Sequence, residues 1–316
     1  MVMTAYTDAH FNNEEAARAT LEAVLWPSGP VCAHCGVINH AYPTKRPGVF
    51  RCAEAVCRKD FSVTMKTVME RSHIPLHKWL LAFHLFTASK KGFSAHQLHR
   101  TLGITYRSAW FMAHRVREAM RAGGLEPMGG EGKIVEADET YFGDVPEGKR
   151  RVSPQRRGRP YTKSGKHGPG GKRAIVSLVE RGGNVRSFHV AVADGATVAN
   201  IVNENVLKET RLHTDESRLY TKVGANFKAH ETVVHRRKEY ARGDVTTNSV
   251  EGYFSIFKRG MKGVYQHCGE KHLHRYLAEY DFRFNHRIAL GYNDGDRAAL
   301  AVKNAAGKRL TYRQPH

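Results

Sequence analysis

Two close pairs of cysteines near the start of this 316-residue chain restrict what that region can fold into. Two residues separate the members of the first pair and four residues separate those of the second. Thiolates on two tight turns are the usual ligands of a tetrahedral zinc ion, so the spacing predicts a structural zinc ribbon. His34 and His40 remain alternative ligands because the second turn is longer than usual. The predicted ligands are Cys32, Cys35, Cys52 and Cys57.

The charge of the chain indicates a polyanionic partner. Fifty Lys and Arg residues against thirty Asp and Glu residues give 50 − 30 = +20, which favours nucleic acid or an anionic membrane surface. No apolar run of about 18 residues occurs, so we expect no membrane span. The N-terminus lacks the basic and apolar regions of a secretory signal. We therefore expect a cytoplasmic protein with reduced cysteines, in which the fifth, Cys268, is a packing residue.

Three acidic residues stand at the ends of expected elements. Asp138 closes the apolar run KIVEAD and Asp215 closes RLHTD, and both runs indicate strands. Glu251 lies near the start of the amphipathic segment NSVEGYFSIFKRG, which indicates a helix. Carboxylates are ligands of hard cations such as Mg²⁺, and a pair of such ions can hold the attacking and leaving oxygens of a phosphodiester. In a basic chain, the three acids favour metal-dependent chemistry on nucleic acid.

Each of these acids also has a structural interpretation. Asp138 could end a solvated strand, and Asp215 could be an ordinary turn residue. Glu251 fits a capping box in which Asn248 is the N-cap residue. Lys258 follows Glu251 by two helical turns and shares its face, so it could meet a phosphate or be simply solvated.

A helical region before the acids has the pattern of a helix-turn-helix. Gly103 falls at the expected turn, and the second helix has a core face that includes Ala109 and Val116. A basic face with one aromatic residue would suit contact with DNA, although a solvated face with Trp110 packed on a neighbour is an equal alternative. The predicted DNA-binding residues are Arg107, Trp110, His114, Arg117 and Arg121.

The pattern of elements predicts an α/β fold with several domains. Strand patterns that follow a Gly-rich linker, with a strand–helix–strand unit among them, indicate a mixed sheet covered by helices. A segment at 143–173 that is rich in basic residues, Pro and Gly is expected to be a mobile loop ordered by a polyanion. We predict an N-terminal helix and zinc ribbon at 1–72, a DNA-binding helical region at 73–122, a catalytic domain at 133–288 and a basic tail of low order at 289–316.

Several of these segments resemble a known family. The cysteine pairs, the segment KKGFSAHQLHRTLGITYRSAWFMAHRVREAM, the strand VEADETYFG and the segment TTNSVEGYFSIFKRGMKGVYQHCGEKHLHRYLAEYDFRFNHR are similar to bacterial insertion-sequence transposases. These enzymes pair a zinc ribbon with a ribonuclease-H-like DDE domain. The resemblance covers about residues 20–288.

The resemblance implies a reaction and its residues. Asp138, Asp215 and Glu251 would hold Mg²⁺ (or Mn²⁺) ions for DNA cleavage and strand transfer, and Lys258 would touch DNA. The third acid is Asn in some members and Glu here. The implied partners are transposon terminal inverted repeats, target DNA and further copies of the chain in a homo-oligomer. Three alternatives remain, namely a nuclease of the same fold that does not join strands, a non-enzymatic DNA-binding regulator and a domesticated, inactive transposase.

Overall fold

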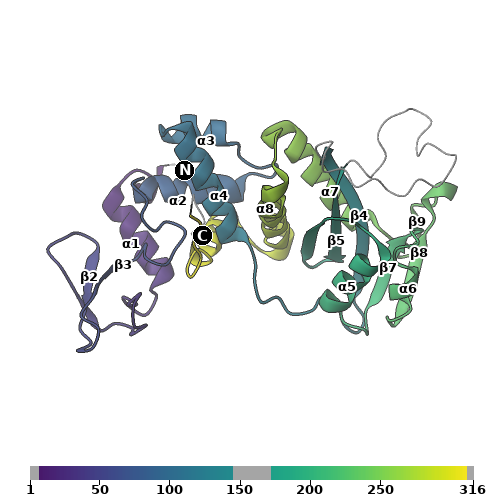
Figure 1. Cartoon of the computed structure of the whole chain (residues 1–316), viewed down its shortest axis with the longest axis horizontal. Coiled ribbons are helices and arrows are strands. Elements are labelled where there is room, and N and C mark those ends of the chain that lie inside the picture. Colours follow the sequence, from purple (N-terminus) through teal and green to yellow (C-terminus); the bar gives the residue numbers. More distant parts are fainter. Residues whose placement is uncertain (1–6, 145–171, 312–316) are drawn as a thin grey trace. The chain divides into compact units, whose positions relative to one another are not determined.

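The computed structural model describes residues 7–144 and 172–311, and the chain forms two compact units (Figure 1). Unit 1 comprises Met1–Arg121 and His286–His316, and unit 2 comprises Ala122–Asn285. Unit 2 is therefore inserted into the sequence of unit 1. Residues 145–171, which make up most of the predicted basic insert, lie outside the described residues.

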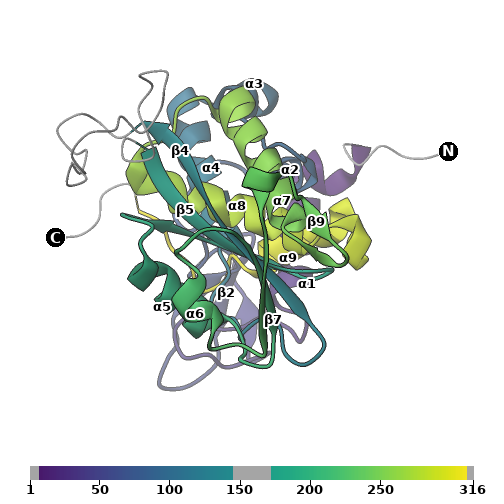
Figure 2. The same ribbon diagram turned by 90° about the vertical axis from the view of Figure 1, so that its right-hand side faces the viewer.

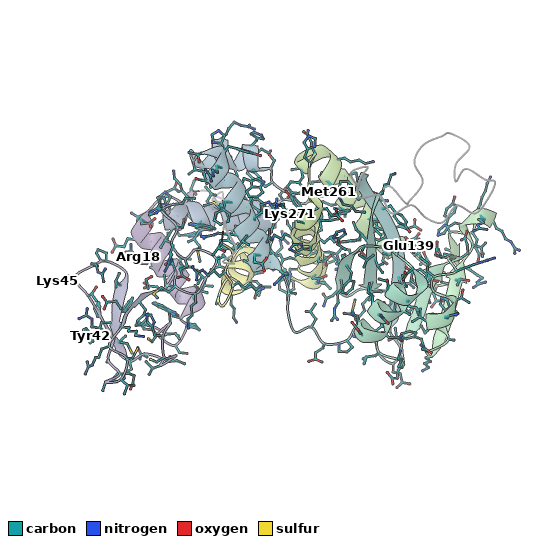
Figure 3. The ribbon with its side chains drawn as sticks, in the orientation of Figure 1. Arg18, Tyr42, Lys45, Glu139, Met261 and Lys271 are labelled. Atoms are coloured by element: carbon teal, nitrogen blue, oxygen red, sulfur yellow. The ribbon has the colours of Figure 1, made fainter. Side chains whose placement is uncertain are left out.

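The first part of unit 1 is a helix followed by a small sheet. Helix α1 (Glu14–Leu25) begins where the side chain of Asn13 accepts two backbone N–H bonds. The antiparallel sheet has the order β1-β2-β3, with Tyr42 of β1 and Lys45 extending outward (Figure 3). Aromatic rings of Trp26, Phe50 and Phe61 pack against one another behind the sheet. The strands are β1 (Ala41–Pro43), β2 (Val49–Cys52) and β3 (Asp60–Ser62).

The rest of unit 1 is helical, with helices α2 (Leu76–Ala88), α3 (Ala95–Leu102), α4 (Tyr106–Met120) and α9 (Asp294–Lys303). The Glu14 carboxylate accepts a bond from the Leu76 N–H at 2.9 Å and so joins α1 to the start of α2. Gly103 forms the turn between α3 and α4 with a φ of 59°, a conformation that glycine adopts without strain.

Helix α9 corrects the prediction of a C-terminal tail of low order. Asn293 and Asp296 form a capping box at its start, and Ala301 and Val302 are buried. The Arg297 guanidinium donates to the Thr87 carbonyl in α2 at 3.1 Å. The basic residues of this segment hid a short amphipathic helix that packs in unit 1.

Unit 2 is built on a five-stranded sheet with the order β6-β5-β4-β7-β8. The first three strands in this order pair antiparallel, whereas β4, β7 and β8 pair in parallel. Figure 2 shows β4, β5 and β7 side by side. The strands are β4 (Ile134–Asp144), β5 (Lys172–Glu180), β6 (Val185–Val190), β7 (Arg211–Asp215) and β8 (Ala229–Val233).

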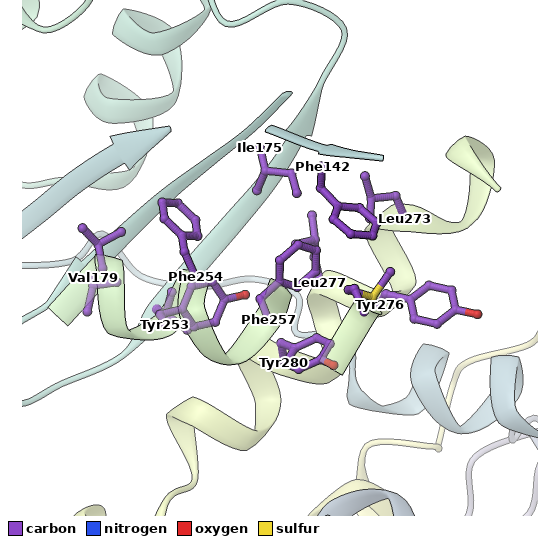
Figure 4. Close-up of a cluster of buried hydrophobic side chains, with 13 residues drawn as sticks. Phe142, Ile175, Val179, Tyr253, Phe254, Phe257, Leu273, Tyr276, Leu277 and Tyr280 are labelled. Carbon is purple, nitrogen blue, oxygen red and sulfur yellow. The ribbon is translucent and has the colours of Figure 1, made fainter. Parts of the chain in front are cut away.

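Helices cover both faces of this sheet. Helices α5 (Gly195–Asn205) and α6 (Thr221–Gly224) pack on one face over Val176 and Leu212. Helices α7 (Asn248–Gly260) and α8 (Leu273–Asn285) pack on the other, where Phe254, Phe257 and Tyr280 form an aromatic core (Figure 4). The short elements that remain are η2 (Ala9–Phe11), η5 (His235–Arg237), β9 (Ala241–Arg242), β10 (Val245–Thr246), η6 (Met261–Tyr265), η7 (Glu270–His272) and η8 (Ile288–Leu290).

The strand order and the pairing directions are those of a ribonuclease-H-like sheet, so the predicted α/β fold class is confirmed. Strand β5 contributes to both cores, since Ile175 and Val179 enter one of them and Val176 and Leu178 enter the other. Within the described ranges, no helix has both the length and the apolar character needed to cross a bilayer.

Candidate active site and zinc site

Two of the predicted acids stand at equivalent positions of neighbouring strands. Strands β4 and β7 pair with Ile134 opposite Arg211 and Glu136 opposite His213, an offset of 211 − 134 = 77 residues. The offset between Asp138 and Asp215 is also 215 − 138 = 77, so the two acids occupy equivalent positions, two residues beyond the last pair of the ladder. The pairing of the two strands ends at Glu136, and the strands therefore separate where the acids stand.

The carboxyl groups at this place interact electrostatically. Burial, and then the charges of Glu139 and Asp215, raises the pKa of Asp138 to about 8, and Glu251 contributes in the same direction. The pKa of Asp215 is raised mainly by burial, with Glu251 again contributing. The pKa of Glu139, which is labelled in Figure 3, is raised by burial and by Asp215. A cation would relieve this crowding, so the donor set fits a hard metal ion.

A buried carboxylate fastens the helix of Glu251 to the strand of Asp138. Glu136 is fully buried, and it accepts bonds from the N–H groups of Ser249 and Val250 at 2.7 and 3.1 Å. The Arg181 guanidinium donates to the same carboxylate at 2.8 Å. An anion at a helix N-terminus is stabilised by unpaired N–H groups and by the helix dipole. Glu136 thus sets where α7 begins.

This arrangement replaces the capping box considered for Glu251. Helix α7 has no side-chain capping bond from its own N-cap residue, Thr247. Instead, the Thr247 hydroxyl donates to Oε1 of Glu251 at 2.9 Å. The carboxyl group of Glu251 is exposed, and its charge acts on Asp138 and Asp215.

Lys258 lies on α7 beside the acids. Burial lowers the pKa of its ammonium group, and the nearby charge of Asp138 opposes that shift. Lys262 and Lys172 lower the same pKa further, so two other cations lie near Lys258. The lysine is neither buried in the core nor remote from the acids.

Two residues at this place were not singled out from the sequence. Glu139 accepts bonds from the hydroxyls of Ser217 and Tyr220 at 3.5 and 3.1 Å. Its position directly after Asp138 in EADET was the only available signal. His235 contacts the Glu251 carboxylate at 3.3 Å, and nothing in the local sequence marks it.

The predicted zinc ligands form a compact thiol cluster in unit 1. The Sγ atoms of Cys32 and Cys57 are 3.8 Å apart, and those of Cys35 and Cys52 are 3.6 Å apart. All four sulfurs lie within 4.8 Å of one another. Zn–S bonds of about 2.3 Å give a tetrahedron with edges of about 3.8 Å, whereas a disulfide is about 2.05 Å long. The cluster fits one structural zinc ion.

The two alternative histidine ligands are engaged elsewhere. His34 Nε2 lies 3.1 Å from the Asp60 carbonyl oxygen, and His40 Nδ1 lies 2.8 Å from the Glu54 carboxylate. Arg58 adopts a φ of 48° directly after the second turn. Cys57 therefore completes the ligand set.

We expect purified protein to contain about one zinc ion per chain. Cys52→Ser should lower the zinc content and unfold the β1–β3 sheet, since zinc binding contributes the folding free energy of such small modules. Cys268→Ser is the matched control, because Cys268 lies outside the thiol cluster. Metal analysis and far-UV circular dichroism measure both effects, and full zinc content in the Cys52→Ser protein would contradict the assignment.

The predicted DNA-binding face of α4 needs a correction. Arg107 and Arg121 are exposed, and Trp110 is partly buried. His114 and Arg117, however, are buried, with 1% and 2% of their surface exposed. The Arg117 guanidinium lies over the Phe86 ring of α2 at 5.2 Å from its centroid, so it packs within unit 1. Helix α4 contacts α2, α3 and α9, which leaves no continuous basic face.

This chain has a mixed sheet with carboxylates where two of its strands separate, and it also has a zinc ribbon. Together these features define a class of ribonuclease-H-like proteins that act on nucleic acid. The profile of the ISXO2-like transposase domain matches residues 129–285, and that of the transposase zinc-ribbon domain matches residues 12–60. An uncharacterised protein in transposable element ISH50 of Halobacterium salinarum is 29% identical over 258 residues, covering 79% of this chain and 83% of the relative. The chain belongs to the ISXO2-like transposase family.

Proposed function

We propose that this transposase cleaves DNA at the ends of an insertion sequence and joins the resulting 3′-hydroxyl to target DNA. The carrying observation is that Asp138 and Asp215 occupy equivalent positions on adjacent strands, beside the helix of Glu251. The relative from Halobacterium salinarum, whose name places it in a transposable element, supports the same substrate class. We further propose that the protein acts in the cytoplasm, where its DNA substrate would lie. We also propose that it works in assemblies of more than one copy.

Each residue of the site has a separate task in this proposal. Asp138 and Asp215 offer carboxylates from adjacent strands, and Glu251 offers a third from α7. Bound Mg²⁺ or Mn²⁺ would activate water or a 3′-hydroxyl and stabilise the leaving oxygen. Lys258 would bind a phosphate next to the scissile bond, because its ammonium group lies near Asp138. No protein nucleophile is needed, so one site serves both cleavage and joining.

We propose a pair of ions at these acids rather than one. Two ions about 4 Å apart can stabilise the attacking and the leaving oxygens of a phosphodiester together. Three carboxylates offer oxygen ligands for both ions, because Mg²⁺ is usually bound by one or two carboxylates.

Two DNA substrates test the proposal. A duplex that carries one end of the element should be cut only when Mg²⁺ or Mn²⁺ is present. A pre-cut end with a free 3′-hydroxyl should be joined to a target plasmid. Cutting without joining would instead identify a nuclease of the same fold. Specific binding without either reaction would identify a regulator.

Unit 1 should recognise DNA through exposed rather than buried arginines. Arg107→Ala should weaken binding and reduce the slope of log affinity against log salt by about 1, as expected for one lost phosphate contact. Arg117→Ala is the matched control, and it should lower thermal stability while the folded protein keeps its affinity. Fluorescence anisotropy at several salt concentrations measures both. If Arg117→Ala weakened DNA binding more than Arg107→Ala did, the basic face predicted for α4 would be supported after all.

A further inference from the structure

His235 lies against the carboxylate of Glu251. It begins the turn η5 that follows β8, and 28% of its side chain is exposed. Its Nε2 lies 3.3 Å from Oε1 of Glu251 and 3.4 Å from Oγ1 of Thr247. Because the Thr247 hydroxyl donates to Glu251 at 2.9 Å, its oxygen accepts from Nε2, which therefore carries a proton. The imidazole thus holds Thr247 by a hydrogen bond and lies in contact with the Glu251 carboxylate.

The contacts of Thr247 and His235 with Glu251 involve the same carboxylate oxygen. The Thr247 hydroxyl reaches Oε1 at 2.9 Å, and His235 reaches Oε1 from another element. Within the described ranges, these contacts leave Oε2 to other ligands. Metal-binding carboxylates are typically held in this way, with an outer hydrogen bond fixing the direction in which the ligand oxygen points.

The backbone of His235 is tied to the strand that carries Asp215. Glu216, the next residue after Asp215, accepts the N–H of His235 at 2.8 Å and that of Arg236 at 3.3 Å. The imidazole also contacts the Tyr240 ring, with centroids 5.5 Å apart. His235 thus connects the end of β7 to Glu251, and it does so independently of the bond between Glu136 and the start of α7.

We propose that His235 is a positioning residue that orients the Glu251 carboxylate toward the cation proposed at these acids. The inference rests on the proposed function, because a cation must bind at these acids for the orientation to matter. His235 acts through Glu251 and touches neither the DNA nor the reacting atoms.

The test uses the full-length, zinc-loaded protein and two replacements of His235. His235→Phe keeps a ring against Tyr240 but cannot donate, whereas His235→Gln places an amide donor near the position of Nε2. Mn²⁺ affinity is measured without DNA, from the electron paramagnetic resonance signal of free Mn²⁺. We expect His235→Phe to weaken the affinity by about 10- to 100-fold and His235→Gln to recover most of it. The Mn²⁺ concentration for half-maximal DNA cleavage should shift in parallel.

An Asp138→Asn protein separates this inference from the proposed function. If the Asp138→Asn protein binds as much Mn²⁺ as the wild-type protein does, the proposed metal site itself is wrong. If Asp138→Asn removes binding while His235→Phe binds within about twofold of wild type, only the role of His235 is overturned. A glutamine variant as weak as the phenylalanine variant would also overturn it, because the donor would then not be the property that matters. Thermal unfolding of both His235 variants shows whether they are folded.

Discussion

Asp138→Asn should abolish metal-dependent DNA cleavage and also make the stability of the metal-free protein less sensitive to a rise in pH toward about 8. The pKa of this carboxyl is raised from 3.8 to about 8, first by burial and then by neighbouring acids. A raised pKa stabilises the folded protein fully at low pH, and this contribution is lost as the pH rises through about 8. Asparagine has no charge to bury. The variant should therefore lose less thermal stability than wild type between about pH 5 and pH 8.5.

The measurement needs zinc in place, so the protein is melted without chelator and without added Mg²⁺. Asp244→Asn is the control in the same unit: the hydrogen bond from Arg211 lowers the pKa of Asp244, so this carboxyl is ionised throughout the window and its variant should keep the pH dependence of wild type. The loss of cleavage should exceed the roughly 10- to 100-fold effect typical of residues that only support a metal ligand. Parallel curves of thermal stability against pH for the wild-type and Asp138→Asn proteins would show that folding does not raise the pKa of Asp138.

Glu136→Gln should destabilise unit 2 by about 3–5 kcal/mol, because it leaves the Arg181 charge without its buried partner. The start of α7 would lose its anion as well, so exchange of amide hydrogens should increase in peptides from β4 and α7. Trp26, Trp79 and Trp110 all belong to unit 1. Their fluorescence therefore reports the unfolding of unit 1, which serves as an internal reference for unit 2 during urea unfolding.

A surface acid provides the matched control for Glu136. Glu131 pairs with Lys228 at 3.4 Å, and its side chain is 85% exposed. Glu131→Gln should change the stability by no more than about 0.5 kcal/mol. Equal free energies of unfolding for the Glu131→Gln and Glu136→Gln proteins would mean that the buried hydrogen bonds of Glu136 do not hold α7 in place.

The sequence predicted features that depend on local spacing. The cysteine pairs predicted a zinc cluster, because the geometry of zinc ligands acts over a few residues. Strand and helix patterns predicted the fold class, which the sheet confirms. The fourth zinc ligand stayed open, since the contacts that engage His34 and His40 come from residues distant in sequence.

The remaining differences have the same physical origin. The capping partner of α7 is Glu136, which lies 113 residues before Ser249, so no local motif could identify it. Periodicity located the core face of α4 correctly as far as Ala109 and Val116 are concerned. It could not show that Arg117 is also covered, because that depends on Phe86 of another helix. His235 contacts Glu251 only through the fold.

Because unit 1 is formed by two separate stretches of sequence, its second stretch is synthesised only after unit 2. Helix α9 packs against α2, and Arg297 satisfies the Thr87 carbonyl, yet α9 is translated only after all of Ala122–Asn285. Domains of growing chains fold as units as they emerge. The ribosome therefore releases a complete ribonuclease-H-like unit before the zinc-bearing unit can close. A truncated product that ends at residue 121 would lack α9 and, with it, the bond from Arg297 to the Thr87 carbonyl.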